Sequence, residues 1–306
     1  MRVNKNSFKS YYRRHRDAFN AFYLLCVPVG FWLIFSIYPM FFGLSLGFLE
    51  WKGLSGSVKF VWFNNFAAFF KSAVWRNSLL RTIGIGMMCF TLTTVTGCLV
   101  ALLLNKIKRG QGVFRMIWYI PAIVSGVAVS QIFSILMKYD GGVINNTIIR
   151  LGGEPVYWRN STGWMIFWIA LYSTWTGLGG ATLIWLSALQ SINPSLIEAS
   201  KLDGCNRFQS FLHISLAQMR PLILFLTVNG FIAAMNIYEV VLFISGGGPL
   251  GNTEVLAYNI MRAGFWDNDF GMAGAASMVV LLITAGFSVM IFKKQVKSYS
   301  RKGGEA

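Results

Sequence analysis

Residues 192–221 read INPSLIEASKLDGCNRFQSFLHISLAQMRP and form a polar stretch between two long apolar segments. Asn193 and Pro194 predict the start of a helix, because Asn accepts a hydrogen bond from a free amide and Pro has no amide to lose. Gly204 predicts the end of that helix, since glycine adopts a left-handed backbone at no steric cost. A second short helix should follow, with an apolar face formed by Phe208, Phe211 and Leu212.

The rest of the chain is strongly apolar. Of its 306 residues, 55% are hydrophobic and 12% are charged, whereas soluble domains carry roughly 25% charged residues. Long apolar runs of this kind predict membrane spans. We therefore expect an all-α integral membrane protein with six transmembrane helices, at about 20–48, 78–104, 113–137, 163–189, 222–244 and 270–292.

Basic residues give this membrane topology an orientation. Eighteen of the 27 Lys and Arg residues lie on the side that holds both termini, and nine lie in the loops on the other side. Because basic residues accumulate in cytoplasmic loops, both termini and residues 192–221 are predicted to be cytoplasmic. This accumulation of basic residues accounts for the net charge of +16, which therefore does not indicate a nucleic-acid-binding protein.

Three parts follow from this topology. Residues 1–75 are a basic cytoplasmic N-terminus, the first span and an aromatic-rich outer loop. Residues 76–292 form a five-helix core with the cytoplasmic loop at 192–221, and residues 293–306 are a basic cytoplasmic tail.

Chemistry-bearing motifs are absent from the sequence. The four Cys residues are scattered without CxxC spacing, the two His residues lie outside the apolar runs, and no GxxxxGK[ST] phosphate-binding loop occurs. We therefore expect no catalytic residue and no metal site. Ser and Thr residues in the spans are explained as helix-packing residues.

Within the opening stretch, Glu198-Ala199-Ser200 is followed by Asp203-Gly204-Cys205, and then by Ile214-Ser215-Leu216 and Pro221. This spacing resembles the cytoplasmic EAA loop of permeases of binding-protein-dependent ABC importers. Ala217 stands where that family has a proline, so the sequence does not predict how the chain continues after the second helix.

Other segments resemble the carbohydrate branch of that family, the maltose and multiple-sugar type. They are Tyr119-Ile120-Pro121 with Ser125, Gly142–Asn145, Ser245–Pro249 with Asn252–Leu256, and Phe270–Ala273. The likeness implies the fold of a type I ABC importer permease in a bacterial or archaeal cell membrane. It implies the translocation of an oligosaccharide or a polyol-like solute.

The resemblance also implies partners. Cytosolic ATPase subunits would bind ATP and Mg, so this chain needs no cofactor of its own. A second, different permease would complete the pathway, and an extracytoplasmic binding protein would deliver the solute. The residues implied to couple to the ATPase are Glu198, Ala199, Ser200, Leu202, Asp203, Gly204 and Phe208.

Residues of the fourth and fifth spans, together with Ser125 of the third, are candidates for the solute path. Aromatic rings stack on sugars, hydroxyls bond to sugar hydroxyls and glycine leaves room. The alternative, that the small residues only pack helices, stays open. Glu239 is either a functional carboxylate or a hydrated one near the outer end of its span. The candidates are Ser125, Tyr172, Ser173, Thr176, Gly177, Gly180, Gly230, Ala234, Asn236 and Ile237.

Three other readings compete with a carbohydrate importer. A polytopic membrane enzyme or assembly factor would use residues 192–221 only for docking. An ABC permease for a non-sugar solute would share every motif above. A secondary transporter would need ion-coupling carboxylates at mid-membrane or inverted repeats, and the sequence shows neither.

Overall fold

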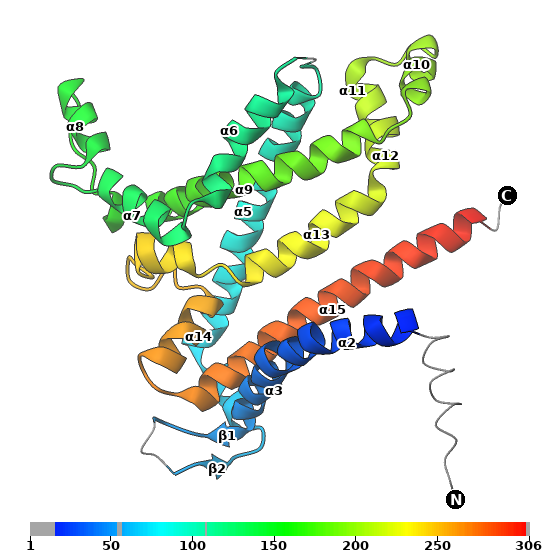
Figure 1. The fold of residues 1–306 in the computed structure, drawn as a ribbon. Coiled ribbons are helices and arrows are strands. Elements are labelled where there is room, and N and C mark those ends of the chain that lie inside the picture. Colours follow the sequence, from blue (N-terminus) through cyan, green and yellow to red (C-terminus); the bar gives the residue numbers. More distant parts are fainter. Residues whose placement is uncertain (1–15, 54–56, 108, 304–306) are drawn as a thin grey trace, which may run out of the picture.

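The computed structural model describes residues 16–53, 57–107 and 109–303, which are mostly helical (Figure 1). Within these ranges the strands are one short antiparallel pair, β1 (Leu49–Glu50) and β2 (Lys59–Phe60). The dominance of helices confirms the all-α class. Most of the predicted basic N-terminus falls on residues 1–15, outside the described residues.

Long helices and short connecting helices alternate along the chain. The helices of the first half are α2 (Arg16–Trp32), η1 (Leu33–Ile37), α3 (Tyr38–Ser45), η2 (Leu46–Phe48), α4 (Asn64–Lys71), α5 (Ala73–Leu104), α6 (Gln111–Ile123), α7 (Gly126–Leu136), α8 (Val143–Arg150) and η3 (Trp158–Asn160). Those of the second half are α9 (Thr162–Gln190), α10 (Pro194–Leu202), α11 (Arg207–Ser210), η4 (Phe211–Ser215), α12 (Leu216–Gln218), α13 (Arg220–Met235), η5 (Val241–Ser245), α14 (Leu256–Phe265) and α15 (Phe270–Gly303).

The segments predicted for the two sides of the membrane are separated in space. The turn between α5 and α6, the α10–α12 segment and the far end of α15 lie toward the top and right of Figure 1. The β1–β2 pair, α8 and α14 lie toward its left and bottom. This separation fits a chain whose connections alternate between two faces.

The predicted third span, 113–137, is not one straight helix. It divides into α6 and α7, which meet at an angle of 87°. Val124 takes an extended backbone conformation with ψ of 142°, and Ser125 is also outside the helical range with ψ of 126°. The Tyr172 hydroxyl donates a 3.0 Å hydrogen bond to the Gly126 carbonyl, which holds the start of α7 in its new direction.

The predicted fifth span, 222–244, is interrupted as well. Helix α13 ends at Met235, and a helix resumes after Ile237 and Tyr238. The Asn236 side-chain amide donates a 2.8 Å hydrogen bond to the Ile232 carbonyl. Short polar side chains that satisfy backbone groups in this way compete with helix continuation.

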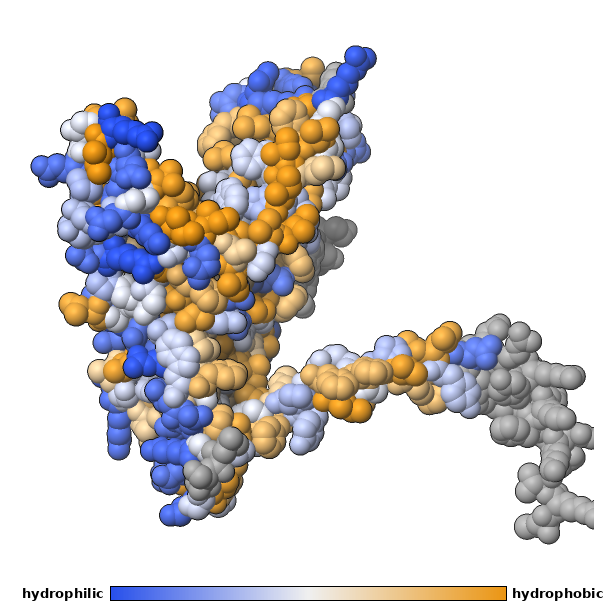
Figure 2. All heavy atoms as spheres, turned by 60° about the vertical axis from the view of Figure 1, so that its left-hand side comes forward, coloured by the Kyte–Doolittle hydropathy of each residue, from blue (hydrophilic) through white to orange (hydrophobic). Residues whose placement is uncertain are grey.

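Among the residues that the structure describes, three helical segments are long and apolar enough to cross a membrane, namely Phe22–Phe48, Ala73–Leu104 and Phe270–Lys294. Two bent helix pairs also qualify, α6 with α7 and the segment Arg207–Gln218 with α13, which raises the number to as many as five. The predicted fourth span, 163–189, is the 29-residue helix α9, but it is not among these candidates. Hydrophobic residues cover much of the surface between more hydrophilic ends (Figure 2).

Small residues bring the central helices together. A Cβ atom on Gly97 of α5 would lie 2.7 Å from the Ala181 Cβ of α9, and one on Gly86 would lie 2.6 Å from the Ala234 carbonyl oxygen of α13. Close backbone approach at small residues is a common way for membrane helices to associate. Helix α5 is thus packed tightly against both α9 and α13.

Replacing Gly97 by leucine is therefore expected to destabilise the helix bundle by about 1–3 kcal/mol, because the added side chain would push α5 and α9 apart. The measurement is thermal unfolding of the purified chain in detergent. Gly84→Leu on the same helix is the matched control, since no atom lies within 4 Å of a Cβ at that position. Equal melting temperatures for the two variants would contradict the packing described.

Candidate functional site

Helix α10 begins as the Asn-Pro pair predicts. The Asn193 side-chain oxygen accepts a 3.1 Å hydrogen bond from the Ser195 amide, and Pro194 occupies the first turn. This cap satisfies one of the amides that a helix start leaves free.

Helix α10 ends at Leu202, and the predicted terminating glycine, Gly204, follows two residues later. Gly204 has a φ of +82°, in the left-handed region that glycine accepts most easily. The Cys205 amide donates to the Ser200 carbonyl at 2.9 Å, and the Gly204 amide donates to the Lys201 carbonyl at 3.1 Å. These two bonds form the glycine-terminated helix end known as the Schellman motif.

The second helical arm starts with a capping box. The Asn206 side chain accepts from the Gln209 amide at 2.8 Å, and the Gln209 side chain accepts from the Asn206 amide at 2.9 Å. The arm runs through α11, η4 and α12 to Gln218 and turns by 75° into α13 at the buried Met219. The turn forms although Ala217 stands in place of the family's proline.

Ser200 lies inside the loop. Its side chain is 2% exposed, and its hydroxyl lies 2.9 Å from the hydroxyl of the buried Ser210 on the other arm. The resemblance implied that Ser200 packs against a partner, but its place inside the loop assigns it to holding the two arms together.

The remaining residues proposed for coupling, apart from Gly204 at the turn, form an exposed surface, which we call the docking face. It consists of Glu198, Ala199, Leu202, Asp203 and Phe208. Leu202 is 89% exposed and Phe208 is 70% exposed. Large apolar side chains exposed next to charged ones at a polar end of the molecule are typical of a surface that a protein partner covers.

The base of the loop packs on the ends of the long helices. Ile197 and Phe211 pack against a buried cluster that includes Leu104 of α5, Leu189 of α9 and Leu226 of α13. The same loop also joins α9 directly to α13 in the chain. A displacement of the docking face would therefore move the ends of all three helices.

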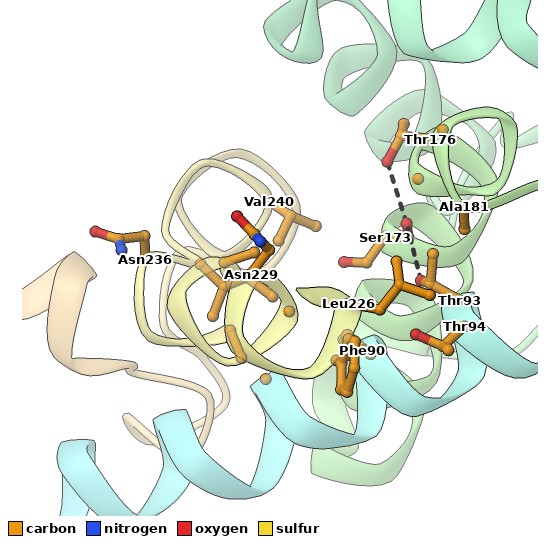
Figure 3. Close-up of a pocket in the computed structure, with 18 of the residues that line it drawn as sticks. Phe90, Thr93, Thr94, Ser173, Thr176, Ala181, Leu226, Asn229, Asn236 and Val240 are labelled. Atoms are coloured by element: carbon orange, nitrogen blue, oxygen red, sulfur yellow. Dashed lines mark hydrogen bonds between the residues drawn. The ribbon is translucent and has the colours of Figure 1, made fainter. Parts of the chain in front are cut away.

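These three helices, with the residues that follow α13, line an open cavity of about 550 Å³ (Figure 3). Nine of the ten residues predicted for the solute path line it, namely Tyr172, Ser173, Thr176, Gly177, Gly180, Gly230, Ala234, Asn236 and Ile237. Ser125 does not line it and lies exposed at the break between α6 and α7.

Hydroxyl and amide groups are spread over the cavity wall. Thr176 donates to the Tyr172 carbonyl at 3.0 Å, and Thr93 donates to the Ser173 carbonyl at 3.5 Å. The Asn229 amide donates to the Phe225 carbonyl at 2.9 Å. Each of these side chains keeps acceptor capacity after its bond within the protein. Such a wall suits a solute rich in hydroxyl donors.

The glycines of the path have different roles. A Cβ on Gly177 would lie 2.8 Å from the Thr93 Cγ2, and one on Gly230 would collide with the Phe90 ring, so both glycines permit helix packing. No atom lies within 4 Å of a Cβ on Gly180, which faces open space. Helix packing therefore explains Gly177 and Gly230, whereas Gly180 leaves room in the solute path.

The sequence prediction missed the contribution of α5. Gly86, Cys89, Phe90, Thr93 and Thr94 also line the cavity, beside Asn229 and Glu239. Their spacing of three and four residues places them on one helix face. That periodicity is the signal in the sequence, but it does not tell a cavity face from a packing face.

Among the residues that the structure describes, no group of three or more His, Cys, Asp or Glu is placed to hold a metal ion. The acidic residues of the cavity and the docking face lie in separate parts of the molecule.

Comparison with known proteins gives matches over most of the chain. Residues 66–298 match the family model described as "Binding-protein-dependent transport system inner membrane component". The lactose transport system permease protein LacF of Rhizobium radiobacter is 29% identical over 95% of this chain and 97% of its own. The multiple sugar-binding transport system permease protein MsmF of Streptococcus mutans is 26% identical over 89% and 94%.

Two further matches widen the comparison. The sn-glycerol-3-phosphate transport system permease protein UgpA of Yersinia enterocolitica is 29% identical over 89% of this chain and 92% of its own. The crystal structure of a bacterial ABC transporter involved in the import of the acidic polysaccharide alginate superposes with a TM-score of 0.80, at 21% identity over 94% of this chain and 99% of that one. The structural match supports the helical fold.

Proposed function

The chain belongs to the binding-protein-dependent transport system inner-membrane components, and from this premise we propose that it forms one half of the membrane pathway of an ABC importer for a carbohydrate. It is a transport subunit and not an enzyme. The observation that carries the proposal is the buried cluster beneath the loop, which joins the docking face to all three helices of the cavity.

A carbohydrate is the solute class that fits the cavity and the relatives best. LacF and MsmF are named for lactose and multiple-sugar transport. The wall offers the aromatic side chains of Phe90 and Tyr172 together with threonine, serine and asparagine, and this mixture matches the alternating apolar and hydroxyl surfaces of a sugar. A polyol phosphate is the second candidate, because UgpA is named for sn-glycerol-3-phosphate transport.

The proposed energy source is a pair of cytosolic ATPase subunits that bind ATP and Mg, since this sequence contains no phosphate-binding loop. The docking face would lie in a cleft of one ATPase, with Glu198 as its charged contact. Closure of the ATPases on ATP would then move the loop and the helices attached to it, and the cavity would alternate between the two sides of the membrane.

The proposed topology has six spans with both termini in the cytoplasm. Helix α9 is the sixth span in addition to the candidates described above. A different permease chain would complete the pathway, and an extracytoplasmic binding protein would deliver the solute.

The test is to purify the chain with the products of neighbouring genes and to measure sugar uptake into proteoliposomes. The proposal requires uptake that depends on ATP and on the binding protein. Uptake that is indifferent to ATP, with no ATPase in the purified complex, would refute it.

Phe211→Ala is expected to uncouple hydrolysis from transport. Phe211 packs into the cluster beneath the loop, so its loss should loosen the link between the loop and the cavity helices while the docking face stays intact. We expect the number of solutes imported per ATP hydrolysed to fall roughly tenfold, the equivalent of about 1.4 kcal/mol of coupling.

Phe208→Ala is the matched comparison, because Phe208 is exposed on the docking face. That variant should weaken ATPase association and leave the number of solutes imported per ATP hydrolysed unchanged. If both variants change the same quantity, the docking face and the buried cluster do not have the separate roles of binding the ATPase and transmitting its movement.

A further inference from the structure

Glu239 is the one charged side chain among the described residues that line the cavity. The other lining residues are apolar or carry neutral hydroxyl, amide or thiol groups, and no Lys, Arg or His is among them. This is unexpected in a chain whose net charge is +16.

The structure places Glu239 where the two interrupted spans meet. It follows the break after α13, and its Oε2 lies 2.8 Å from the position that a Cβ on Gly126, the first residue of α7, would occupy. The Tyr172 hydroxyl lies 3.2 Å from the same position. The start of a helix attracts negative charge, so this corner of the wall suits a carboxylate.

The carboxylate is not neutralised by a neighbour. Within the described part of the chain, the ion pairs are those of Arg262 with Glu254 and with Asp267, both outside the cavity. Glu239 is itself exposed, so its charge is hydrated. Among the described residues, the apolar walls of the cavity carry no opposite charge, and such walls focus the field of a single-sign charge into the cleft.

We propose that Glu239 gives the cavity a negative potential that excludes anionic solutes, so that the carbohydrate it passes is uncharged. A neutral sugar can donate hydroxyl hydrogen bonds to the carboxylate, whereas a uronate or a phosphate meets charge repulsion there. The inference rests on the proposed function and narrows its substrate class, setting this cavity apart from an importer of an acidic polysaccharide and from a phosphate-ester permease.

A reactive thiol measures this potential directly. The four native cysteines are replaced, Ser173→Cys is introduced in the cavity wall, and the full-length chain is placed in lipid nanodiscs. Modification rates are measured with three methanethiosulfonates of similar size, one cationic (trimethylammonium), one anionic (sulfonate) and one neutral. The neutral reagent reports accessibility, and the charged pair reports potential.

Glu239→Gln is expected to lower the cation-to-anion rate ratio at this thiol by about fivefold or more, since removing one unit charge from the wall of the same cavity changes the two rates in opposite directions. The neutral reagent should react at an unchanged rate. Glu239→Asp should keep the ratio, and so should the control Glu254→Gln, whose carboxylate lies outside the cavity.

A smaller fall in the ratio for Glu239→Gln, or an equal fall for Glu254→Gln, would overturn the inference. The assay needs no ATPase, no binding protein and no transported sugar. Its failure therefore leaves the import proposal standing, and a failure of ATP-driven uptake leaves this result interpretable.

Discussion

Replacing Glu198 by arginine is expected to abolish ATP-driven uptake, with less than a few per cent of the activity remaining. The side chain is exposed on the docking face beside Leu202. The substitution removes the proposed attraction to the ATPase and adds a like charge, which at a protein interface costs about 2–5 kcal/mol. ATPase association should weaken by about thirtyfold or more.

The chain itself should remain folded and inserted, because an exposed residue without a hydrogen-bond network rarely affects stability by more than about 0.5 kcal/mol. Glu154→Arg is the control, since it makes the same charge change at an exposed position between α8 and α9. Retained uptake in Glu198→Arg, or equal losses in both variants, would show that the docking face does not contact an ATPase.

Gly180→Trp is expected to block uptake while the complex still assembles. Gly180 faces open space in the cavity of about 550 Å³, so an indole ring there would occupy the solute path without displacing a helix. Thr176→Trp, one turn earlier on the same wall, should have the same effect. ATP hydrolysis by the assembled complex should continue, because the docking face is untouched.

Gly286→Trp is the matched control for this block. It introduces the same side chain on α15, at a position outside the cavity where no atom lies within 4 Å of a Cβ. Uptake at the parental rate is expected for the control. Unchanged transport in Gly180→Trp would place the solute path elsewhere.

The loop at residues 192–221 was the most predictable part of the fold, because its structure depends on residues that act on their immediate neighbours. Asn193, Pro194 and Gly204 act within one or two residues of their position, and the structure shows the cap and the left-handed turn that they predict. The position of Ser200 was not predictable in the same way. Its contact with Ser210 joins two arms, and spacing along one helix does not reveal it.

The two interrupted spans could not be predicted from hydrophobicity. A hydropathy window averages over about nineteen residues, whereas each break involves two or three. At the first break a hydroxyl from Tyr172 on another helix donates to the Gly126 carbonyl, and at the second the Asn236 side chain donates to the Ile232 carbonyl. A contact between helices and the orientation of a single side chain are not visible to a hydropathy average.

The candidate solute path was predicted in part. Resemblance and residue chemistry identified the cavity face of α9 and most of that of α13. They did not identify the cavity face of α5, because its threonines are equally typical of helix-packing residues. Only the structure separates Gly180, which faces space, from Gly177 and Gly230, which face side chains.

In the proposed mechanism, ATP binding is transmitted through residues 192–221 and changes the side from which the cavity is open. A single cysteine introduced at Gly180 in the assembled transporter reports this change when it is labelled by an impermeant thiol reagent added from outside. We predict slow labelling without nucleotide and at least tenfold faster labelling when ATP and the loaded binding protein are trapped on the complex, with Glu198→Arg abolishing the difference. Equal labelling in both states would show that ATP binding does not change access to the cavity.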